Sequence, residues 1–267
     1  MPEGHTLHRL ARRQCKHFGG QTVRTSSPQG RFAEGAAVID GMEFADAQAW
    51  GKHLIQTYRR GAQHQLVHVH LGLYGAFTEM LLPMGEPVGQ VRLRIVGEEM
   101  GTDLRGPTAC ELFTPADLDA LVARLGPDPL RRDAAPERAW QAINRSARPV
   151  GALLMDQKVI AGVGNVYRAE ILFRAHIDPM RPGKKLSRNE FDELWQDLVG
   201  LMRIGVRRGK MHVVRAEDDH GAPAYAANRP RTYVYRRAGE ACRICGSTVL
   251  TTELEGRNLF WCPTCQS

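Results

Sequence analysis

The chain has 267 residues, of which 43% are hydrophobic and 24% charged, a composition typical of a globular protein rather than a disordered one. Its length predicts about two domains and a core that can form without disulfide bonds. The mean hydropathy of -0.35 and the lack of a long apolar run exclude a membrane span.

Positive charge is concentrated in the second half of the chain. Residues 1–130 carry 13 Lys and Arg against 14 Asp and Glu, whereas residues 131–267 carry 23 against 15. A basic surface in one part of a protein favours a polyanionic partner such as nucleic acid. Charge alone is equally consistent with a basic protein that has no such partner. We expect no secretory leader, since no cationic start and apolar run follow Met1.

The first half of the chain predicts one helix followed by many strands. A helix is expected over Thr6–Phe18, because its apolar residues share one face and Gly19 and Gly20 follow it. Residues 91–95 alternate between aliphatic side chains and arginines, which indicates a half-buried strand. The other expected strands are Ala37–Asp40, His53–Tyr58, Gln65–Leu71, Tyr74–Met80 and Ala109–Phe113. Many strands with Gly-rich turns predict a β-sandwich or a barrel.

The second half of the chain predicts mainly helices. Residues 114–117 (Thr-Pro-Ala-Asp) form a helix start, and the Pro-rich run 127–136 indicates a linker. Further helices are expected over Glu137–Ser146, Val150–Asp156, Asn165–Ala175 and Ser187–Ile204. Ser187 and Glu190 have the spacing of a capping box. We therefore expect an α+β protein with domains at 1–126 and 137–237 and a terminal module at 238–267.

Four cysteines have the spacing of a zinc site. Two Cys-x2-Cys pairs, separated by 16 residues, contain Cys242, Cys245, Cys262 and Cys265. Each pair can bind metal from one tight turn, and two such turns supply four thiolates to one zinc ion. The strand-like runs Thr248–Leu254 and Leu259–Trp261 predict a hairpin with the metal at its open end. A redox Cys-x2-Cys is the alternative, but it leaves one pair without a role.

Residues 157–167 place two glycines directly before a helix. Glycines allow close backbone approach, and the unpaired N–H groups at a helix start attract phosphate. The segment is not a dinucleotide fingerprint, because no third glycine follows at the required spacing. Two glycines before a helix would, taken alone, indicate only a turn.

Four segments in one order resemble the formamidopyrimidine-DNA glycosylase / endonuclease VIII (Fpg/Nei) family. They are MPEG at the start, WGKHL, QKVIAGVGNVYRAEILF, and CRICG with EGRNLFWCPTCQS at the end. The resemblance spans essentially the whole chain. It implies a bifunctional DNA glycosylase/AP lyase with an N-terminal β-sandwich that follows a leading helix. It also implies a C-terminal helical domain with a helix-two-turns-helix motif and a zinc-finger β-hairpin.

The residues at the chain start support this chemistry. Pro2 is small enough to permit removal of Met1, after which its nitrogen is a chain-terminal secondary amine. Such an amine is partly unprotonated near neutral pH and can attack C1′ of a sugar, forming an iminium that promotes β- and δ-elimination. The resemblance implies that Glu3 is the general acid/base and that Lys52 holds a phosphate. Without it, an ordinary chain start and a surface lysine would be the better interpretations.

The resemblance also implies DNA-binding roles. Asn165 at the helix start and Arg257 in the zinc hairpin are expected to hold the backbone beside the lesion. His70 is interpreted as a strand residue or a phosphate contact, because its neighbouring histidines lack the carboxylate pattern of a metal site. Leu73 and Tyr74 fit a wedge that fills the gap left by an extruded base. The alternatives are a plain N-cap, a solvated arginine and a strand end that packs inward. The zinc ion is expected to be structural, because four thiolates leave no open coordination position.

One departure from the family pattern removes a carboxylate. Another, together with the Leu73–Tyr74 pair that is similar to endonuclease VIII, favours the endonuclease VIII branch, which acts on oxidised pyrimidines. The family commonly has proline at position 5 and glutamate at position 6, where this chain has His5 and Thr6. No Arg-x-Phe insertion pair is evident, and residues 104–107 occupy the expected region. The alternatives are an 8-oxoguanine/formamidopyrimidine enzyme, a non-catalytic DNA-binding zinc protein of this fold, and an RNA-binding zinc ribbon. We expect a cytosolic, nucleoid-associated monomer that binds damaged or abasic double-stranded DNA.

Overall fold

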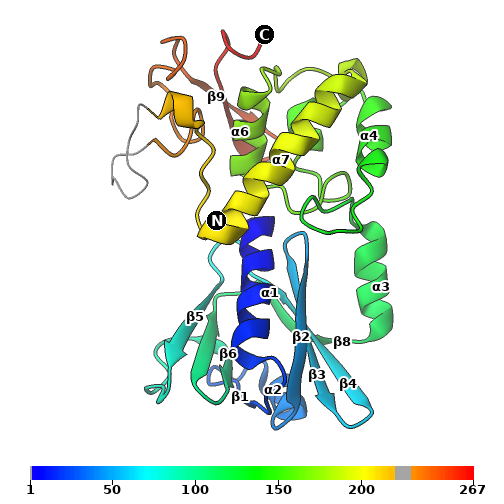
Figure 1. Cartoon of the computed structure of the whole chain (residues 1–267), viewed down its shortest axis with the longest axis vertical. Helices are drawn as coiled ribbons and strands as arrows, with labels where there is room; N and C mark the ends of the chain where they lie inside the picture. Colours follow the sequence, from blue (N-terminus) through cyan, green and yellow to red (C-terminus); the bar gives the residue numbers. More distant parts are fainter. Residues whose placement is uncertain (1, 220–229) are drawn as a thin grey trace. The chain divides into compact units, whose positions relative to one another are not determined.

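The computed structural model describes residues 2–219 and 230–267 (Figure 1). The chain forms two compact units, Met1–Arg124 and Leu125–Ser267. Within the described ranges, no helix combines the length and the apolarity that crossing a bilayer requires.

The first unit is a β-sandwich with a leading helix. It begins with α1 (Gly4–Phe18) and also contains the short helices α2 (Ala33–Ile39) and α3 (Pro115–Arg124). Its strands are β1 (Arg24–Ser26), β2 (Glu43–Trp50), β3 (His53–Arg60), β4 (Gln63–His70), β5 (Ala76–Leu81), β6 (Val91–Val96), β7 (Met100–Arg105) and β8 (Ala109–Phe113). They form two antiparallel sheets, ordered β1-β6-β7-β5 and β2-β3-β4-β8. The predicted sandwich and its leading helix are confirmed.

The core of this unit lies between the sheets and α1. Leu7 and Phe18 on the inner face of α1 are fully buried and belong to one hydrophobic cluster with Phe44 and Tyr58. The alternation predicted over 91–95 is confirmed, since Val91, Leu93 and Ile95 are buried while the arginines between them are only half-buried. Burial of these side chains on both sheets holds α1, and with it the chain start, in a fixed place.

The predicted strand Ala37–Asp40 is wrong, because residues 37–39 form the last turn of α2. Ala36 and Ile39 are buried while Ala37 and Val38 are exposed, which is a helical and not an alternating pattern. A short apolar run does not distinguish the two by periodicity. The strand predicted from Tyr74 begins two residues later, at Ala76. β1, β2 and β7 were not predicted, since small or polar residues interrupt their alternation.

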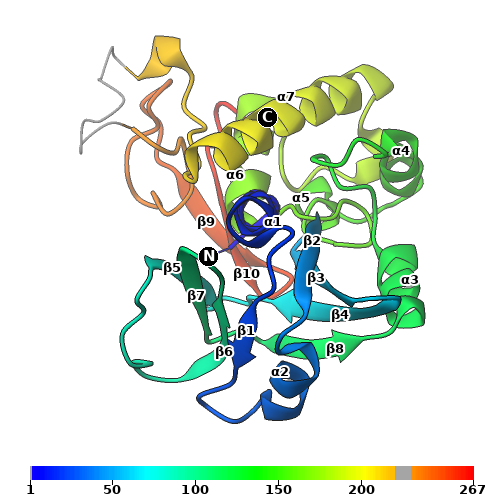
Figure 2. The ribbon, with the colours of Figure 1, turned by 60° about the horizontal axis from the view of Figure 1, so that its bottom comes forward.

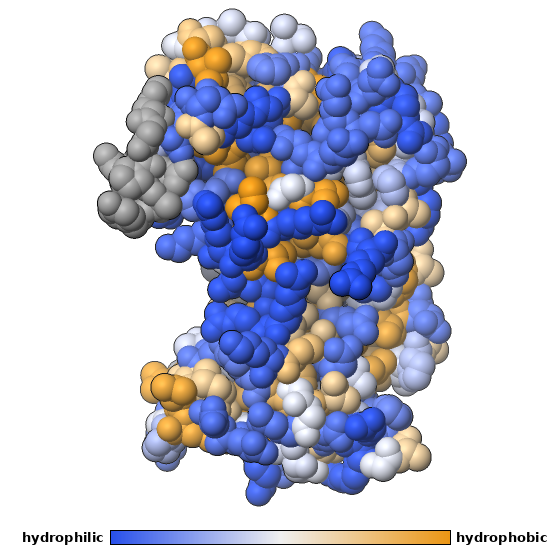
Figure 3. Space-filling view, viewed as in Figure 1, coloured by the Kyte–Doolittle hydropathy of each residue, from blue (hydrophilic) through white to orange (hydrophobic). Residues whose placement is uncertain are grey.

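Buried polar groups explain why β7 has no apolar alternation. Asp103 is fully buried and accepts hydrogen bonds from the guanidinium groups of Arg94 and Arg105. Arg105 also donates to the carbonyl of Val88, 2.9 Å away, which ties down the loop between β5 and β6. Leu81, at the end of β5, and Val88, in the loop after it, are exposed aliphatic side chains. Figure 3 shows hydrophobic residues on the surface at its lower left, the side on which β5 lies in Figure 1.

The second unit combines helices with a zinc-finger hairpin. Its helices are α4 (Pro136–Asn144), α5 (Val150–Leu153), α6 (Asn165–Arg174) and α7 (Arg188–Arg208), with 3-10 turns η1 (Gly183–Lys185) and η2 (Ala216–Asp218). The hairpin consists of β9 (Leu250–Leu254) and β10 (Arg257–Trp261), which lie beside α6 in Figure 2. The helix predicted over Val150–Asp156 ends at Leu153, and the residues after it form a turn.

Helix α7 has the predicted capping box. The Ser187 hydroxyl accepts the N–H of Glu190, and the Glu190 carboxylate accepts the N–H of Ser187. The helix continues four residues beyond the predicted end at Ile204 and stops before Gly209, whose φ is +71°. These local signals fix both ends of the longest helix in the second unit.

Removing this cap should destabilise the second unit. Ser187→Ala leaves the N–H of Glu190 without its side-chain acceptor, so we expect the free energy of unfolding to fall by about 1 kcal/mol. Urea denaturation followed by tryptophan fluorescence measures this change. Ser187→Asp keeps an acceptor and should stay close to the original stability, so an equal loss in both variants would contradict the capping role.

Candidate active site and zinc centre

The start of the chain places a carboxyl group beside its terminal residues. Pro2 is half-buried and lies two residues before the start of α1, and Glu3 is the fully buried N-cap of that helix. The carbonyl of Glu3 accepts the N–H of Thr6 at 2.8 Å. The positive end of a helix favours a carboxylate at this position. A potential general acid/base is therefore held on a rigid helix, one residue from Pro2.

The departure from the family pattern at position 5 is a buried histidine. His5 is 4% exposed, and burial is the main cause that lowers its pKa to about 4. Its Nε2 lies 3.4 Å from the hydroxyl of Thr6. His5 is therefore uncharged near neutral pH, and neither His5 nor Thr6 supplies a carboxylate at these two positions.

Lys52 and His70 lie at the same end of one sheet. Lys52 is in the two-residue turn between β2 and β3, where Trp50 pairs with His53. His53 in turn pairs with His70, the last residue of β4. Lys52 is near enough to contribute to the lowered pKa of His70, after burial and His68. The register thus brings together two of the residues predicted to contact phosphate.

The hydrogen bonds of His70 indicate which ring nitrogen carries its proton. The N–H of Gly72 donates to Nδ1 of His70 at 3.2 Å, and the Thr108 hydroxyl lies 2.8 Å from the same nitrogen. Because burial lowers the pKa of His70, its ring is neutral at neutral pH. A neutral ring that accepts at Nδ1 has its proton on Nε2. Nε2 can therefore donate to an anion.

The loop after β4 presents Leu73 and Tyr74 to solvent. Gly75 donates its N–H to the carbonyl of Leu71, which closes the loop, and Gly72 adopts φ +65°. Leu73 is 42% exposed and Tyr74 is 89% exposed. The alternative that these side chains pack inward at a strand end is therefore wrong. Both side chains are accessible to a binding partner.

In the second unit, a glutamine organises the turn before α6. The amide of Gln157 donates to the carbonyls of Met155 and Val163, and its oxygen accepts the N–H of Gly162. Gly162 has φ +90°, which favours glycine at this position. This role of Gln157 is not predictable from the sequence, because its partners lie within a turn that has no periodic pattern.

Asn165 joins the start of α6 to the zinc hairpin. It is the first residue of the helix, whose N-cap is Gly164, so the plain N-cap alternative is wrong. Its Nδ2 donates to the carbonyl of Asn258 at 2.9 Å, and its Oδ1 accepts from Arg168. Arg168 is fully buried and was not singled out from the sequence. It lies three residues after Asn165, a spacing that places both side chains on one face of a helix.

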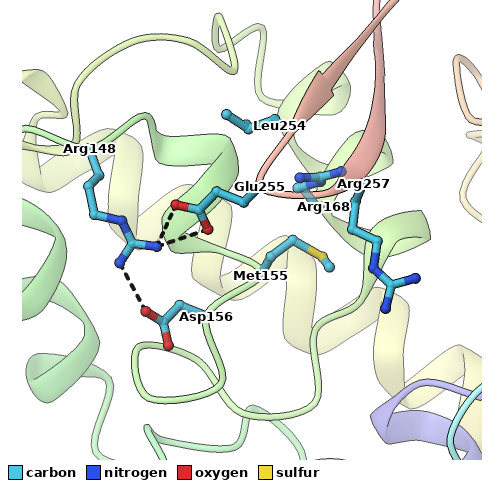
Figure 4. A pocket seen from close by; sticks show the side chains of 7 residues that line it. All are labelled: Arg148, Met155, Asp156, Arg168, Leu254, Glu255 and Arg257. Carbon is cyan, nitrogen blue, oxygen red and sulfur yellow. Dashed lines mark hydrogen bonds and ion pairs between the residues drawn. The ribbon is translucent and has the colours of Figure 1, made fainter.

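Arg257 is the first residue of β10, where it pairs with Leu254 across the hairpin, and Glu255 and Gly256 form the turn itself. The strand-like runs predicted to end at Leu254 and to resume at Leu259 left four residues between them; the turn is shorter than this, and Arg257 is exposed at its edge. A pocket of about 190 Å³ opens beside it (Figure 4). Its lining residues are Arg148, Met155, Asp156, Arg168, Leu254, Glu255 and Arg257. The pocket therefore contains three guanidinium groups and two carboxylates.

The four predicted metal ligands converge at the open end of the hairpin. The sulfur atoms of Cys242, Cys245, Cys262 and Cys265 all lie within 4.8 Å of one another. Two of the sulfur–sulfur distances are 3.9 Å and 3.4 Å. Tetrahedral zinc, with bonds of about 2.3 Å, requires sulfur atoms about 3.8 Å apart. The geometry thus fits a zinc ion bound by four thiolates.

Comparisons with known proteins agree along the whole chain. The family model of the formamidopyrimidine-DNA glycosylase N-terminal domain matches residues 1–109, and the family model of the formamidopyrimidine-DNA glycosylase H2TH domain matches residues 125–216. The zinc finger found in FPG and IleRS matches residues 239–267. The chain belongs to the formamidopyrimidine-DNA glycosylase family. Its zinc finger and four converging cysteines assign it one structural zinc ion.

Relatives and solved structures support the same assignment. Endonuclease 8 1 of Mycobacterium tuberculosis is 60% identical, over 100% of both chains. The crystal structure of the MutM (Fpg) protein from Thermus thermophilus has a TM-score of 0.77 and 30% identity, and covers 99% of this chain and 98% of its own. Lactococcus lactis Fpg in complex with abasic-site DNA has a TM-score of 0.80, 18% identity and 99% coverage of both chains, which supports the fold alone.

Loss of one zinc ligand should abolish DNA binding while leaving the first unit folded. In Cys245→Ser, we expect loss of the metal and disorder of the hairpin that carries Arg257. Metal analysis and a binding assay with abasic-site duplex measure the two effects. Cys15→Ser is the control, because Cys15 lies in the first unit, where its thiol forms hydrogen bonds with Asp46 and Ala47 and is not a zinc ligand. Full DNA binding by zinc-free Cys245→Ser would contradict the structural role of the metal.

Proposed function

We propose that this chain excises oxidised pyrimidines from double-stranded DNA through covalent attack by Pro2. Its family membership makes it a base-excision DNA glycosylase and AP lyase. The observation that carries the proposed mechanism is the buried carboxyl group of Glu3, which follows Pro2 directly and caps the start of α1. The lesion class is supported by 60% identity to a protein named endonuclease 8 1.

In the proposed reaction, the nitrogen of Pro2 acts once Met1 has been removed. A terminal amine with a pKa of about 8 is partly neutral at neutral pH, so its lone pair can attack C1′. As the N–C1′ bond forms, the glycosidic bond breaks and the base leaves with that electron pair and gains a proton. Glu3 then protonates O4′, the ring opens, and an iminium joins Pro2 to C1′.

The iminium makes strand cleavage possible. It withdraws electrons from C2′, so a base removes a C2′ proton and the 3′ phosphate leaves by β-elimination. A second elimination expels the 5′ phosphate. Water finally hydrolyses the imine, which restores the amine of Pro2 for the next turnover.

Other residues hold the DNA during these reaction steps. Lys52 and Nε2 of His70 provide donors for phosphate from the first unit, and Asn165 and Arg257 provide them from the second. Phosphate contacts of this kind position a nucleic acid without reading its sequence. The exposed Leu73 and Tyr74, in the loop after β4, fill the space left when the damaged nucleotide leaves the stack, a step that costs a few kcal/mol.

We place this activity on the nucleoid of a bacterial cytosol, with a monomer as the working form and domains at 1–126, 137–237 and 238–267.

The second candidate substrate is 8-oxoguanine or formamidopyrimidine. A relative from Thermus thermophilus, 31% identical over 100% of this chain and 98% of its own, is named formamidopyrimidine-DNA glycosylase. The greater identity to endonuclease 8 1 and the absence of an Arg-x-Phe pair favour the oxidised-pyrimidine branch.

Borohydride reduction with abasic-site DNA tests the nucleophile. The wild-type protein should form a covalent adduct, because borohydride reduces the iminium. Pro2→Gln should form none, since a large second residue keeps Met1 and moves the terminal amine. Pro28→Gln, at an exposed turn of the same unit, should react like the wild type. An undiminished adduct in Pro2→Gln would exclude Pro2 as the nucleophile.

A panel of matched duplexes tests the lesion class. We expect faster single-turnover excision of thymine glycol and 5-hydroxycytosine than of 8-oxoguanine. Glu3→Gln should reduce the excision rate about 10²–10⁴-fold, because it removes a general acid. Gel separation of the cleaved strands measures these rates. Preferential excision of 8-oxoguanine would assign the chain to the other branch.

A further inference from the structure

We propose that Arg148 is a positioning residue that holds the zinc hairpin in its DNA-binding place. Its guanidinium joins Glu255, in the hairpin turn, to Asp156, in the turn before α6. Arg148 thereby fixes the position of Arg257, which directly follows the hairpin turn. The inference rests on the proposed function of Arg257 as a phosphate contact.

Arg148 contacts both carboxylates with good geometry (Figure 4). One terminal nitrogen lies 2.9 Å from Oδ2 of Asp156, and the other lies 2.8 Å and 3.0 Å from the two oxygens of Glu255. Charge-assisted hydrogen bonds with several contacts to one planar guanidinium constrain direction as well as distance. Residues 148 and 255, which are 107 positions apart in the sequence, are thus held in one arrangement.

Two of the three residues are anchored independently of the hairpin. The carbonyl of Arg148 accepts the N–H of Gly183 at 2.9 Å, and Gly183 packs so closely that a Cβ there would meet the carbonyl oxygen of Ile143 at 2.6 Å. The second carboxylate oxygen of Asp156 accepts the N–H of Lys158 at 3.0 Å. Arg148 and Asp156 therefore form a fixed frame, to which Glu255 attaches the hairpin.

The backbone of the hairpin turn gives a second, independent observation. Glu255 has φ +51° and Gly256 has φ +71°, the left-handed pair of a type I′ turn. Asn, Asp or Gly is preferred at the first of these positions, because a longer side chain with a Cβ is strained there. A glutamate at this position is costly for the backbone, and its contact with Arg148 supplies a reason for it.

The position of Arg257 favours a positioning role for Arg148 rather than direct phosphate binding. In Figure 4, the guanidinium of Arg257 points away from the Arg148–Glu255 pair, with Met155 between them. The donors of Arg148 are directed at two carboxylates, whose negative charge would repel a phosphate at that point. A phosphate can therefore meet Arg257 without separating Arg148 from Glu255.

The direction in which Glu255→Gln changes DNA affinity distinguishes a positioning role of Arg148 from direct phosphate binding by Arg148. We expect Arg148→Ala and Glu255→Gln each to weaken binding of a duplex with a reduced abasic site about three- to fivefold, and the double variant to be no weaker than the poorer single one. Direct phosphate binding by Arg148 would instead make Glu255→Gln bind more tightly. It would also reduce the slope of log affinity against log salt by about 0.9 in Arg148→Ala, whereas a positioning role leaves the slope unchanged.

Control variants distinguish the positioning role of Arg148 from the mere loss of a positive charge, and from failure of the proposed phosphate contact of Arg257. Arg188→Ala removes an arginine of similar exposure (48%) that pairs with Asp192 and Glu137, and it should bind DNA normally. Equal weakening in this control would overturn the proposal. Hydrogen exchange of the turn amides, without DNA, should be faster in Arg148→Ala and Glu255→Gln, and unchanged exchange would also overturn it. Normal DNA binding by Arg257→Ala, in contrast, would remove the proposed function of Arg257 itself.

Discussion

The proposed chemistry depends on one constraint: the nucleophile is the end of the chain, so the backbone can hold it from one side only. The protein meets this constraint by starting a helix two residues after Pro2. Leu7 and Phe18 anchor that helix to the hydrophobic core of the sandwich, and Glu3 is buried at its N-cap. Hydrophobic burial of α1 thereby positions the terminal residues, and the carboxyl group needed beside the amine comes from the same rigid element.

The second unit relies on polar side chains to hold irregular backbone in place. Gln157 closes the turn before α6, and Asn165 joins that helix to the zinc hairpin. Glu170 is fully buried and accepts the N–H groups of Tyr233, Val234 and Tyr235, although burial raises its pKa. Phosphate contacts require fixed donors on loops and turns. The zinc ion and these buried polar groups supply a rigidity that a small hairpin lacks on its own.

Local patterns in the sequence predicted the parts of the fold that local forces determine. The amphipathic α1, the capping box of α7 and the two cysteine pairs were evident because each depends on residues close in sequence. The strand predicted over Ala37–Asp40 overlaps the end of the helix Ala33–Ile39, because so short a segment shows too little periodicity to distinguish the two. β7 was missed because its buried Asp103 is satisfied by arginines that no pattern links to it.

The candidate site was predicted unevenly for the same reason. The spacing of the four cysteines reveals their chemistry, whereas the resemblance was needed to single out Pro2 and supplied the roles of Glu3, Lys52, Asn165 and Arg257. The roles of Arg148 and Gln157 depend on contacts that only the folded chain contains.

Peptide mapping of the adduct is the most direct test of the central claim. Protein reduced with borohydride on abasic-site DNA is digested, and mass spectrometry locates the residue that carries the deoxyribose remnant. The account predicts a modified peptide that begins at Pro2, without Met1. A remnant on the side chain of Lys52, or on a peptide that still begins with Met1, would contradict it.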